Sequence, residues 1–382
     1  MAKKLSGIII FIILTSLFFF IWSKDTKAPS DTMPEISGSE NAIKENAPFN
    51  AIIENLTIPW DIAFLPDNEG LIITERGGRI LYQNSDKELM EIANINIKSG
   101  GEGGLLGLTL HPDFSENRFV YLYLTAPGNA NQTENRVERY RFENNNTLTD
   151  KKVVISGIPG AVYHDGGRME FGPDEKLYIT TGDATNANLA QDLNSLAGKI
   201  LRLNDDGGIP TDNPFKTAIY SYGHRNPQGL TWDMAGNLWS TEHGPSSPIG
   251  SDCCRDELNL IKPGANYGWP TIKGNEKAGG MESPIIHSGN STTWAPASAA
   301  YVVSRNSIFF GGLRGETLYE AVLDGVKVKE LKEHFKNEFG RIRTVRLGPD
   351  GMLHITTSNR DGRGSVHSGD DKIIRINPNS LN

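Results

Sequence analysis

A degenerate unit, in which a turn leads into a strand, recurs along this chain of 382 residues. Its clearest copies are FLPDNEGLIITERGGRI (64–80), HPDFSENRFVYLYLT (111–125), FGPDEKLYITTGD (171–183), WDMAGNLWSTEHG (232–244) and LGPDGMLHITTSN (347–359). SIFFGGLRGETLYEA (307–321) fits the one gap of double length. The units start roughly 45 to 60 residues apart, which is typical of propeller blades. Six units predict an all-β fold, a six-bladed β-propeller with four-stranded antiparallel blades over residues 49–382.

The composition agrees with many short strands and narrows the choice of partners. The 41 glycines and 20 prolines punctuate short segments rich in Ile, Val, Leu, Tyr and Thr. The net charge of −8 provides no broad basic surface, so the composition argues against a nucleic-acid partner.

The N-terminus differs from the rest of the chain. Lys3 and Lys4 precede the apolar run Leu5–Trp22, so residues 1–23 are expected to be a signal peptide or an N-terminal membrane anchor. The run is long for a signal peptide, and no A-x-A site follows it, which slightly favours an uncleaved anchor. Either segment predicts an exported body, periplasmic or at the outer face of the cytoplasmic membrane. Residues 24–48 are predicted to be a flexible tether.

The two cysteines, Cys253 and Cys254, are adjacent. They cannot form a disulfide framework. A vicinal disulfide and two unpaired thiols both remain open.

His164 and Asp183 flank one predicted hairpin. His164 lies in HDGGR, and Asp183 ends YITTGD nineteen residues later. The intervening turn at Pro173–Asp174 and the alternating run Leu177–Thr181 would bring both polar groups to the same rim of a sheet. A histidine beside a carboxylate can act as a general base, although a loop histidine with a hydrogen-bonding role is the simpler interpretation.

Other polar residues follow the repeated strands and would converge on the same end of the channel. They are Glu75–Arg76, Glu242–His243–Gly244–Pro245, Arg314 and Asn359–Arg360, with Glu102 and Arg225–Asn226 on adjoining loops. Such a set indicates a site for a polar ligand.

Over about Leu56 to Asn377 the chain resembles the soluble quinoprotein aldose and glucose dehydrogenases, the glucose/sorbosone dehydrogenase family. The resemblance is carried by the order and spacing of several motifs. They are PWDIAF, GEGGLLGLTLHPDF, HDGGRMEFGP, TGD, GHRNPQGL, EHGP, DELNLIKPGANYGWP, APASAAYV, FFGGLRG and RIRTVRLGPDG. The resemblance implies oxidation of aldose sugars at the C1 hydroxyl to the lactone, with pyrroloquinoline quinone (PQQ) as the hydride acceptor.

The resemblance also implies roles for single residues. His164 matches the general base and Asp183 the carboxylate that orients it. Arg225 and Asn226 match residues that touch the quinone, with Arg225 near the carbonyl that accepts charge. Arg341 and Arg343, which alternate in RIRTV and so share a face, match residues that bind the cofactor carboxylates, although an exposed salt-bridged face is the simpler interpretation. Arg314 falls where some relatives carry lysine.

Calcium is implied in the same way. The resemblance places one ion on the quinone and on the backbone carbonyls of Gly244 and Pro245, where carbonyl oxygen suits a hard cation. It places a second, structural calcium at Glu257 and the carbonyl of Tyr267.

Two departures from the family pattern bear on the site. The loop SSPIGSDCCR (246–255) is longer than the usual glycine-rich link. Glu102, expected to bind substrate, stands where glucose-specific relatives carry glutamine, so its charge either alters sugar preference or is solvated. Long insertions of the glucose-specific dimers are missing from the sequence, which favours a compact, monomeric aldose sugar dehydrogenase.

The sequence therefore predicts an exported quinoprotein aldose dehydrogenase that passes electrons to an external acceptor. A quinone-free propeller that binds glycans or proteins is one alternative. A calcium-dependent propeller lactonase is another, although it would require more side-chain ligands for the calcium ion around the channel. GEGGLLG lacks the strand–turn–helix context of a nucleotide site.

Overall fold

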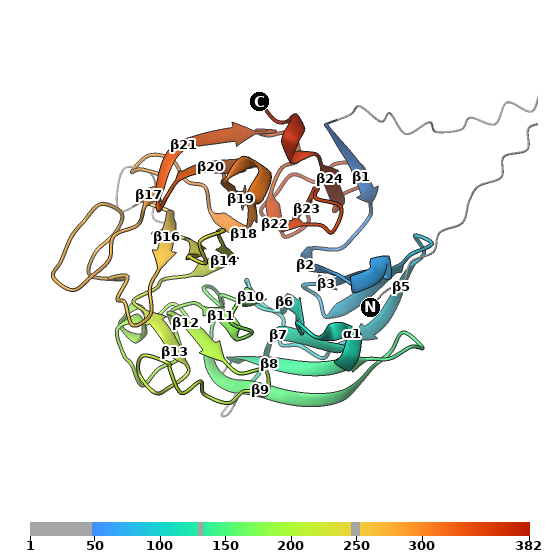
Figure 1. Cartoon of the computed structure of the whole chain (residues 1–382), viewed down its shortest axis with the longest axis horizontal. Coiled ribbons are helices and arrows are strands. Elements are labelled where there is room, and N and C mark those ends of the chain that lie inside the picture. Colours follow the sequence, from blue (N-terminus) through green and yellow to red (C-terminus); the bar gives the residue numbers. More distant parts are fainter. Residues whose placement is uncertain (1–47, 129–132, 246–252) are drawn as a thin grey trace, which may run out of the picture. The chain divides into compact units, whose positions relative to one another are not determined.

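The computed structural model describes residues 48–128, 133–245 and 253–382. The chain divides into two units, Met1–Glu45 and Asn46–Asn382, and all described residues belong to the second. These residues form six four-stranded antiparallel sheets arranged as a ring, which confirms the predicted six-bladed propeller (Figure 1).

Five blades are made of four strands that are consecutive in the chain. In the first two blades these are β2 (Pro59–Phe64), β3 (Gly70–Glu75), β4 (Arg79–Asn84) and β5 (Leu89–Asn94), then β6 (Leu105–Leu110), β7 (Phe119–Pro127), β8 (Thr133–Phe142) and β9 (Leu148–Gly160). The third and fourth blades contain β10 (Met169–Phe171), β11 (Leu177–Thr181), β12 (Lys199–Leu203) and β13 (Ile219–Tyr222), then β14 (Pro227–Trp232), β15 (Leu238–Glu242), β16 (Glu257–Ile261) and β17 (Ile286–His287). The fifth contains β18 (Pro296–Val302), β19 (Ser307–Gly312), β20 (Leu318–Asp324) and β21 (Lys327–His334).

The sixth blade joins the two ends of the propeller. Its strands β22 (Ile342–Leu347), β23 (Leu353–Thr357) and β24 (Ile373–Ile376) are completed at the outer edge by β1 (Phe49–Ile53), which pairs with β24. This pairing closes the ring, because the first strand of the domain is hydrogen-bonded to the last.

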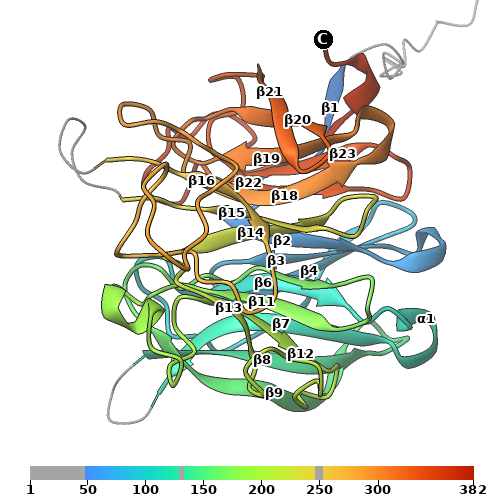
Figure 2. The same ribbon diagram turned by 60° about the vertical axis from the view of Figure 1, so that its left-hand side comes forward.

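Helical structure in the described residues is confined to short turns. They are η1 (Pro66–Asn68), α1 (Phe114–Asn117), η3 (Ala187–Ala190), η4 (Val303–Arg305) and η5 (Pro378–Ser380). The long connection between β16 and β17 projects at the left of Figure 1 and comes forward in Figure 2.

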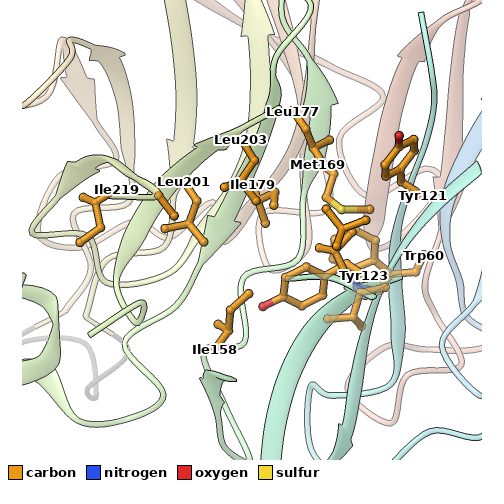
Figure 3. Packing of buried hydrophobic residues seen from close by; sticks show 14 residues of the cluster. Trp60, Tyr121, Tyr123, Ile158, Met169, Leu177, Ile179, Leu201, Leu203 and Ile219 are labelled. Carbon is orange, nitrogen blue, oxygen red and sulfur yellow. The ribbon is translucent and has the colours of Figure 1, made fainter. Parts of the chain in front are cut away.

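The core lies between the blades. Each sheet is covered on both faces by its neighbours, so inner strands such as β11 and β18 are buried along their whole length. Figure 3 shows one such interface, in which Met169, Leu177 and Ile179 of the third blade pack in one cluster with Tyr123 and Trp60. Burial of each large apolar side chain contributes about 1.5–3 kcal/mol, and the ring therefore holds its inner strands firmly in place.

The predicted turn–strand units correspond to the same position in every blade. Each contains the second strand from the channel: β3, β7, β11, β15, β19 or β23. In the unit SIFFGGLRGETLYEA, the turn that leads into the strand is η4, which ends before the unit begins. The residues that follow these strands emerge at the end of the ring where the inner strands begin.

Segment 1–23 and all but the last residue of the tether 24–48 lie outside the described residues, as do residues 246–252 of the long loop. In the ranges that the structure describes, we find no helix long and apolar enough to cross a membrane. Cys253 and Cys254 are both buried and form a disulfide with each other, which decides between the two alternatives for these cysteines.

Candidate active site

A cavity of about 550 Å³ opens where the inner strands begin. Its wall includes the first residues of several inner strands and the loops beside them. The residues that line it include Trp60, Glu102, Leu106, Tyr163, His164, Asp165, Gly166, Arg225, Gln228, His243, Asp256, Arg314, Arg341, Arg343 and Arg363. This volume lies within the usual range for pockets that hold a small organic ligand or cofactor.

His164 and Asp183 lie together at one side of this cavity. The hairpin of β10 and β11 pairs Phe171 with Leu177, so the residues before β10 and after β11 emerge at the same end. The Nδ1 atom of His164 is 2.7 Å from Oδ1 of Asp183. Because a carboxylate only accepts, this bond places a proton on Nδ1, which leaves Nε2 as the ring atom that could act as a general base.

The glycine of TGD makes this close approach possible. A Cβ on Gly182 would lie 2.0 Å from the carbonyl oxygen of His164. The backbone of His164 therefore passes directly beside that of Gly182. His164 itself has a φ of 66°, in a region that few residues other than glycine adopt.

Glu102 fixes the backbone of His164 from the opposite side. Its Oε2 accepts a hydrogen bond from the His164 N–H at 3.0 Å, and its Oε1 accepts from Arg363 at 3.0 Å. Burial opposes ionisation, but the His243 ring, the His164 N–H and Arg363 together hold the pKa of the Glu102 carboxyl at about 2. Both carboxylate oxygens of Glu102 therefore have protein partners.

Three arginines at the cavity lack an ionic partner. In the described residues no carboxylate lies within ion-pair distance of Arg225, Arg314 or Arg343. Burial lowers the pKa of Arg343 to about 9 and lowers the pKa of Arg225 as well. Arg225 and Arg343 are buried, and a buried cation without an ion-pair partner is costly, so an anionic ligand in this cavity would stabilise both side chains.

Arg341 and Arg343 lie on either side of Ile342 at the start of β22 and line the same cavity, as their alternation predicted. Arg341 is held by Asp361 at 2.7 Å and donates to the carbonyl of Leu313 at 2.8 Å. Arg343 donates to Gln228 at 3.0 Å and stacks over the ring of Trp60. Both are buried, so the exposed salt-bridged face is wrong.

Arg225 and Asn226 have different positions relative to the cavity. Arg225 lines it, with Nη1 donating to the His243 carbonyl at 3.3 Å, whereas Asn226 is fully buried behind the wall. The Asn226 Oδ1 accepts from Gly166 N–H and from Gln228, each at 3.1 Å. Arg314 lines the cavity and is exposed.

The four predicted metal-site residues line one small pocket of about 10 Å³, which shares Arg225 and His243 with the large cavity. These residues are Gly244, Pro245, Glu257 and Tyr267. Burial and the neighbouring Glu242 raise the pKa of Glu257 to about 8, which indicates a place that a cation would stabilise. Across the described ranges no three His, Cys, Asp or Glu side chains form a metal-binding group, so a metal here would depend on carbonyl oxygens.

Asp256 organises the wall between the two pockets. Its Oδ1 accepts from Gly244 N–H at 2.9 Å, and its Oδ2 accepts from Thr293, Trp294 N–H and Ala295 N–H. A Cβ on Gly244 would lie 2.0 Å from the Cys254 carbonyl, so the disulfide segment packs against the proposed carbonyl ligands.

Some predicted rim residues do not reach the cavity. Glu75 accepts from Thr57 N–H and pairs with Arg79, and Arg360 donates to the Asp370 carbonyl. In the described part of the chain, the residues that line the cavity do not include Glu75, Arg76, Asn359 or Arg360.

Sequence reasoning missed several residues of the site. The cavity also contains Trp60, Asp165, Gln228, Asp256 and Arg363. Trp60, Asp165, Gln228 and Asp256 stand inside the quoted motifs, which could have marked them. Arg363 lies in a polar loop without a comparable signal.

The fold and the cavity define the class of protein: a six-bladed propeller in which a histidine–carboxylate pair lies at a cavity lined by several arginines. Within that class, the chain belongs to the glucose/sorbosone dehydrogenase family, whose sequence profile matches residues 56–374.

Individual relatives agree with this assignment. The chain is 33% identical over 341 residues to the aldose sugar dehydrogenase of Escherichia coli (strain K12), covering 81% of this chain and 89% of that protein. It is similar to a putative oxidoreductase (glucose dehydrogenase) of Thermus thermophilus, with 41% identity, a TM-score of 0.80 and coverage of 86% and 99%. It is also similar to the PQQ-bound aldose sugar dehydrogenase of Streptomyces coelicolor, with 36% identity, a TM-score of 0.77 and coverage of 86% and 96%.

Proposed function

We propose that this protein oxidises the C1 hydroxyl of aldose sugars to the lactone, with PQQ as the resident cofactor and calcium beside it. The observation that carries the proposal is the His164–Asp183 pair at 2.7 Å, facing a cavity that contains three guanidinium groups with no ion pair to any described residue. A relative at 36% identity has been solved with PQQ bound, which supports the choice of ligand.

The residues present fit the quinone. PQQ carries three carboxylates and an ortho-quinone, and guanidinium groups bind carboxylates in a fixed, planar geometry. The buried Arg343 Nε and His243 Nε2 atoms have no hydrogen-bond partner among the described residues. Such atoms are normally satisfied, so a polar ligand is the expected partner. Arg314, Arg341 and Arg343 would hold the carboxylates, and Arg225, with Asn226 behind it, would lie beside the carbonyl oxygens.

When bound, the quinone supplies the acceptor for the hydride that leaves C1 of the sugar. The protein supplies the base. The Nε2 atom of His164 would take the proton from the oxygen of the C1 hydroxyl while the hydride leaves C1, so the C1–O bond becomes a carbonyl. The Asp183 carboxylate keeps Nδ1 protonated and stabilises the imidazolium that forms. Arg225 offsets negative charge that develops nearby.

Calcium would be held by the backbone carbonyls of Gly244 and Pro245, and a structural calcium by Glu257 and the carbonyl of Tyr267. A hard cation at the first position would act as a Lewis acid towards the cofactor. The hydrogen bond from Gly244 to Asp256 supports a fixed position for these carbonyls.

We further propose that the protein acts outside the cytoplasm as a monomer. The location rests on the sequence of residues 1–23, as a signal peptide or anchor, and on the tether 24–48. The monomeric state rests on the missing insertions of the glucose-specific dimers. Electrons would leave through an external acceptor.

The test is dye reduction by the apoprotein supplied with calcium and PQQ. We expect an artificial dye to be reduced when glucose or another aldose is added, and His164→Ala to abolish turnover while it keeps quinone binding by calorimetry. Failure of every aldose to reduce the dye at saturating cofactor would contradict the proposal. In that case quinone binding would indicate a binding module, and hydrolysis of lactones with calcium alone a lactonase.

A further inference from the structure

Trp269 contacts the proposed base–carboxylate pair from a different blade. It lies in the long connection between β16 and β17, visible at the left of Figure 1 and in front in Figure 2. Its indole Nε1–H donates to Oδ2 of Asp183 at 2.8 Å. The third and fourth blades therefore meet at this carboxylate.

The bond from Trp269 completes the set of donors around Asp183. The other oxygen, Oδ1, accepts from His164 Nδ1 at 2.7 Å and from Thr185 N–H at 2.8 Å. With both oxygens bound, the plane of the carboxylate is fixed, and so is the direction in which it presents Oδ1 to the imidazole. Such partners of a base–carboxylate pair determine the orientation of the ring.

The same indole also supports Arg225. The guanidinium carbon of Arg225 lies 5.4 Å from the centroid of the Trp269 ring, within the range of a cation–π contact. Among the described residues, the guanidinium otherwise has one long hydrogen bond, 3.3 Å from Nη1 to the His243 carbonyl. The tryptophan ring is therefore a principal constraint on this side chain.

Trp269 is itself held by its backbone. Its N–H donates to the Gly223 carbonyl at 2.9 Å, and its carbonyl accepts from Gln191 at 2.7 Å. These bonds attach the backbone of the long connection at Trp269 to the third blade.

We propose that Trp269 is a positioning residue that sets the His164–Asp183 base through its N–H and Arg225 through its ring. The inference rests on the proposed function for its kinetic part only. The contact of Trp269 with Asp183 can be tested without turnover, so the positioning role and the proposed function can fail separately.

The kinetic test separates the two contacts of the indole. Trp269→Phe keeps a ring for Arg225 but removes the N–H, and we expect kcat to fall roughly ten- to hundredfold, with the KM for aldose and the affinity for PQQ nearly unchanged. Trp269→Leu removes both contacts, and we expect a further loss of PQQ affinity of roughly threefold or more.

Trp239→Phe is the matched control. The Trp239 indole donates to Asp233 at 2.9 Å, so this variant loses the same kind of bond away from the cavity. We expect a loss of stability without a change in kcat. An equal fall in kcat in both variants would show that Trp269 acts on stability alone and would overturn the inference.

The indole N–H can be observed directly in protein labelled with ¹⁵N-tryptophan. The chain has six tryptophans, and the Trp269 signal is the one that Trp269→Phe removes. We expect Asp183→Ala to shift this signal and to speed its exchange with solvent. An unmoved signal would overturn the contact even if sugar oxidation is found. A moved signal in a protein without aldose activity would keep the contact and reject the function.

Discussion

Replacing Gly182 by alanine adds one methyl group at the point where the two halves of the proposed base come together. The new Cβ would lie 2.0 Å from the His164 carbonyl oxygen, 2.3 Å from its carbonyl carbon and 2.9 Å from Asn226 Oδ1. Ordinary contacts of this kind are about 3.5 Å, so the His164 backbone must move by about 1 Å or more. Gly182 is not among the positive-φ glycines, so the effect is steric rather than conformational.

Overpacking of this kind costs about 1–3 kcal/mol of stability, and a displacement of about 1 Å at a reacting group lowers the rate by roughly a hundredfold. Urea unfolding of the apoprotein measures the first effect, and dye-linked kcat/KM with added PQQ and calcium measures the second. Gly279→Ala is the control, because nothing lies within 4 Å of its added Cβ and its φ is not positive. Wild-type kcat/KM in a folded Gly182→Ala protein would refute the assigned geometry.

Three further changes test the charges of the site. The pKa of Glu102 is lowered to about 2 in the folded protein, so its ionised form contributes stability above about pH 4.5 that is lost as the pH falls towards 2. Glu102→Gln should therefore lower the free energy of unfolding in urea by about 2–3 kcal/mol at pH 7. A cost that does not shrink below pH 4.5 would contradict this assignment. Arg343→Met removes a buried cation that forms no ion pair with any described residue, so the apoprotein should unfold at the same or a higher urea concentration. Calorimetry should show at least a tenfold loss of PQQ affinity in this variant, and an unchanged affinity would remove Arg343 from the cofactor site. Chelation with EDTA should abolish dye reduction and added calcium should restore it, whereas full activity after exhaustive chelation would exclude the proposed calcium.

The repeated turns and strands were sufficient to predict the fold, because each blade reuses one local pattern. FGPDEKLYITTGD and LGPDGMLHITTSN occupy equivalent places in two blades. The pairing of β1 with β24 was not predictable in the same way. Phe49–Ile53 is a short apolar strand, and nothing in its residues specifies a partner more than 300 positions away.

Pairs of site residues were predictable where a single hairpin or a single strand brings the two side chains close together. His164 and Asp183 flank one hairpin, and Arg341 and Arg343 flank one residue. Contacts between blades were not predictable, because they depend on how separate sheets pack. The bond of Arg363 to Glu102 spans 261 positions, and that of Trp269 to Asp183 spans 86.

The most direct test of the account is a single-turnover reaction of the PQQ- and calcium-loaded protein with glucose deuterated at C1, followed by the absorbance of the quinone. Hydride transfer from C1 with His164 as the base predicts that glucose reduces the quinone, that C1 deuteration slows this reduction, and that His164→Ala with PQQ bound does not show it. A quinone that glucose leaves oxidised, or that His164→Ala reduces at the wild-type rate, would contradict the account.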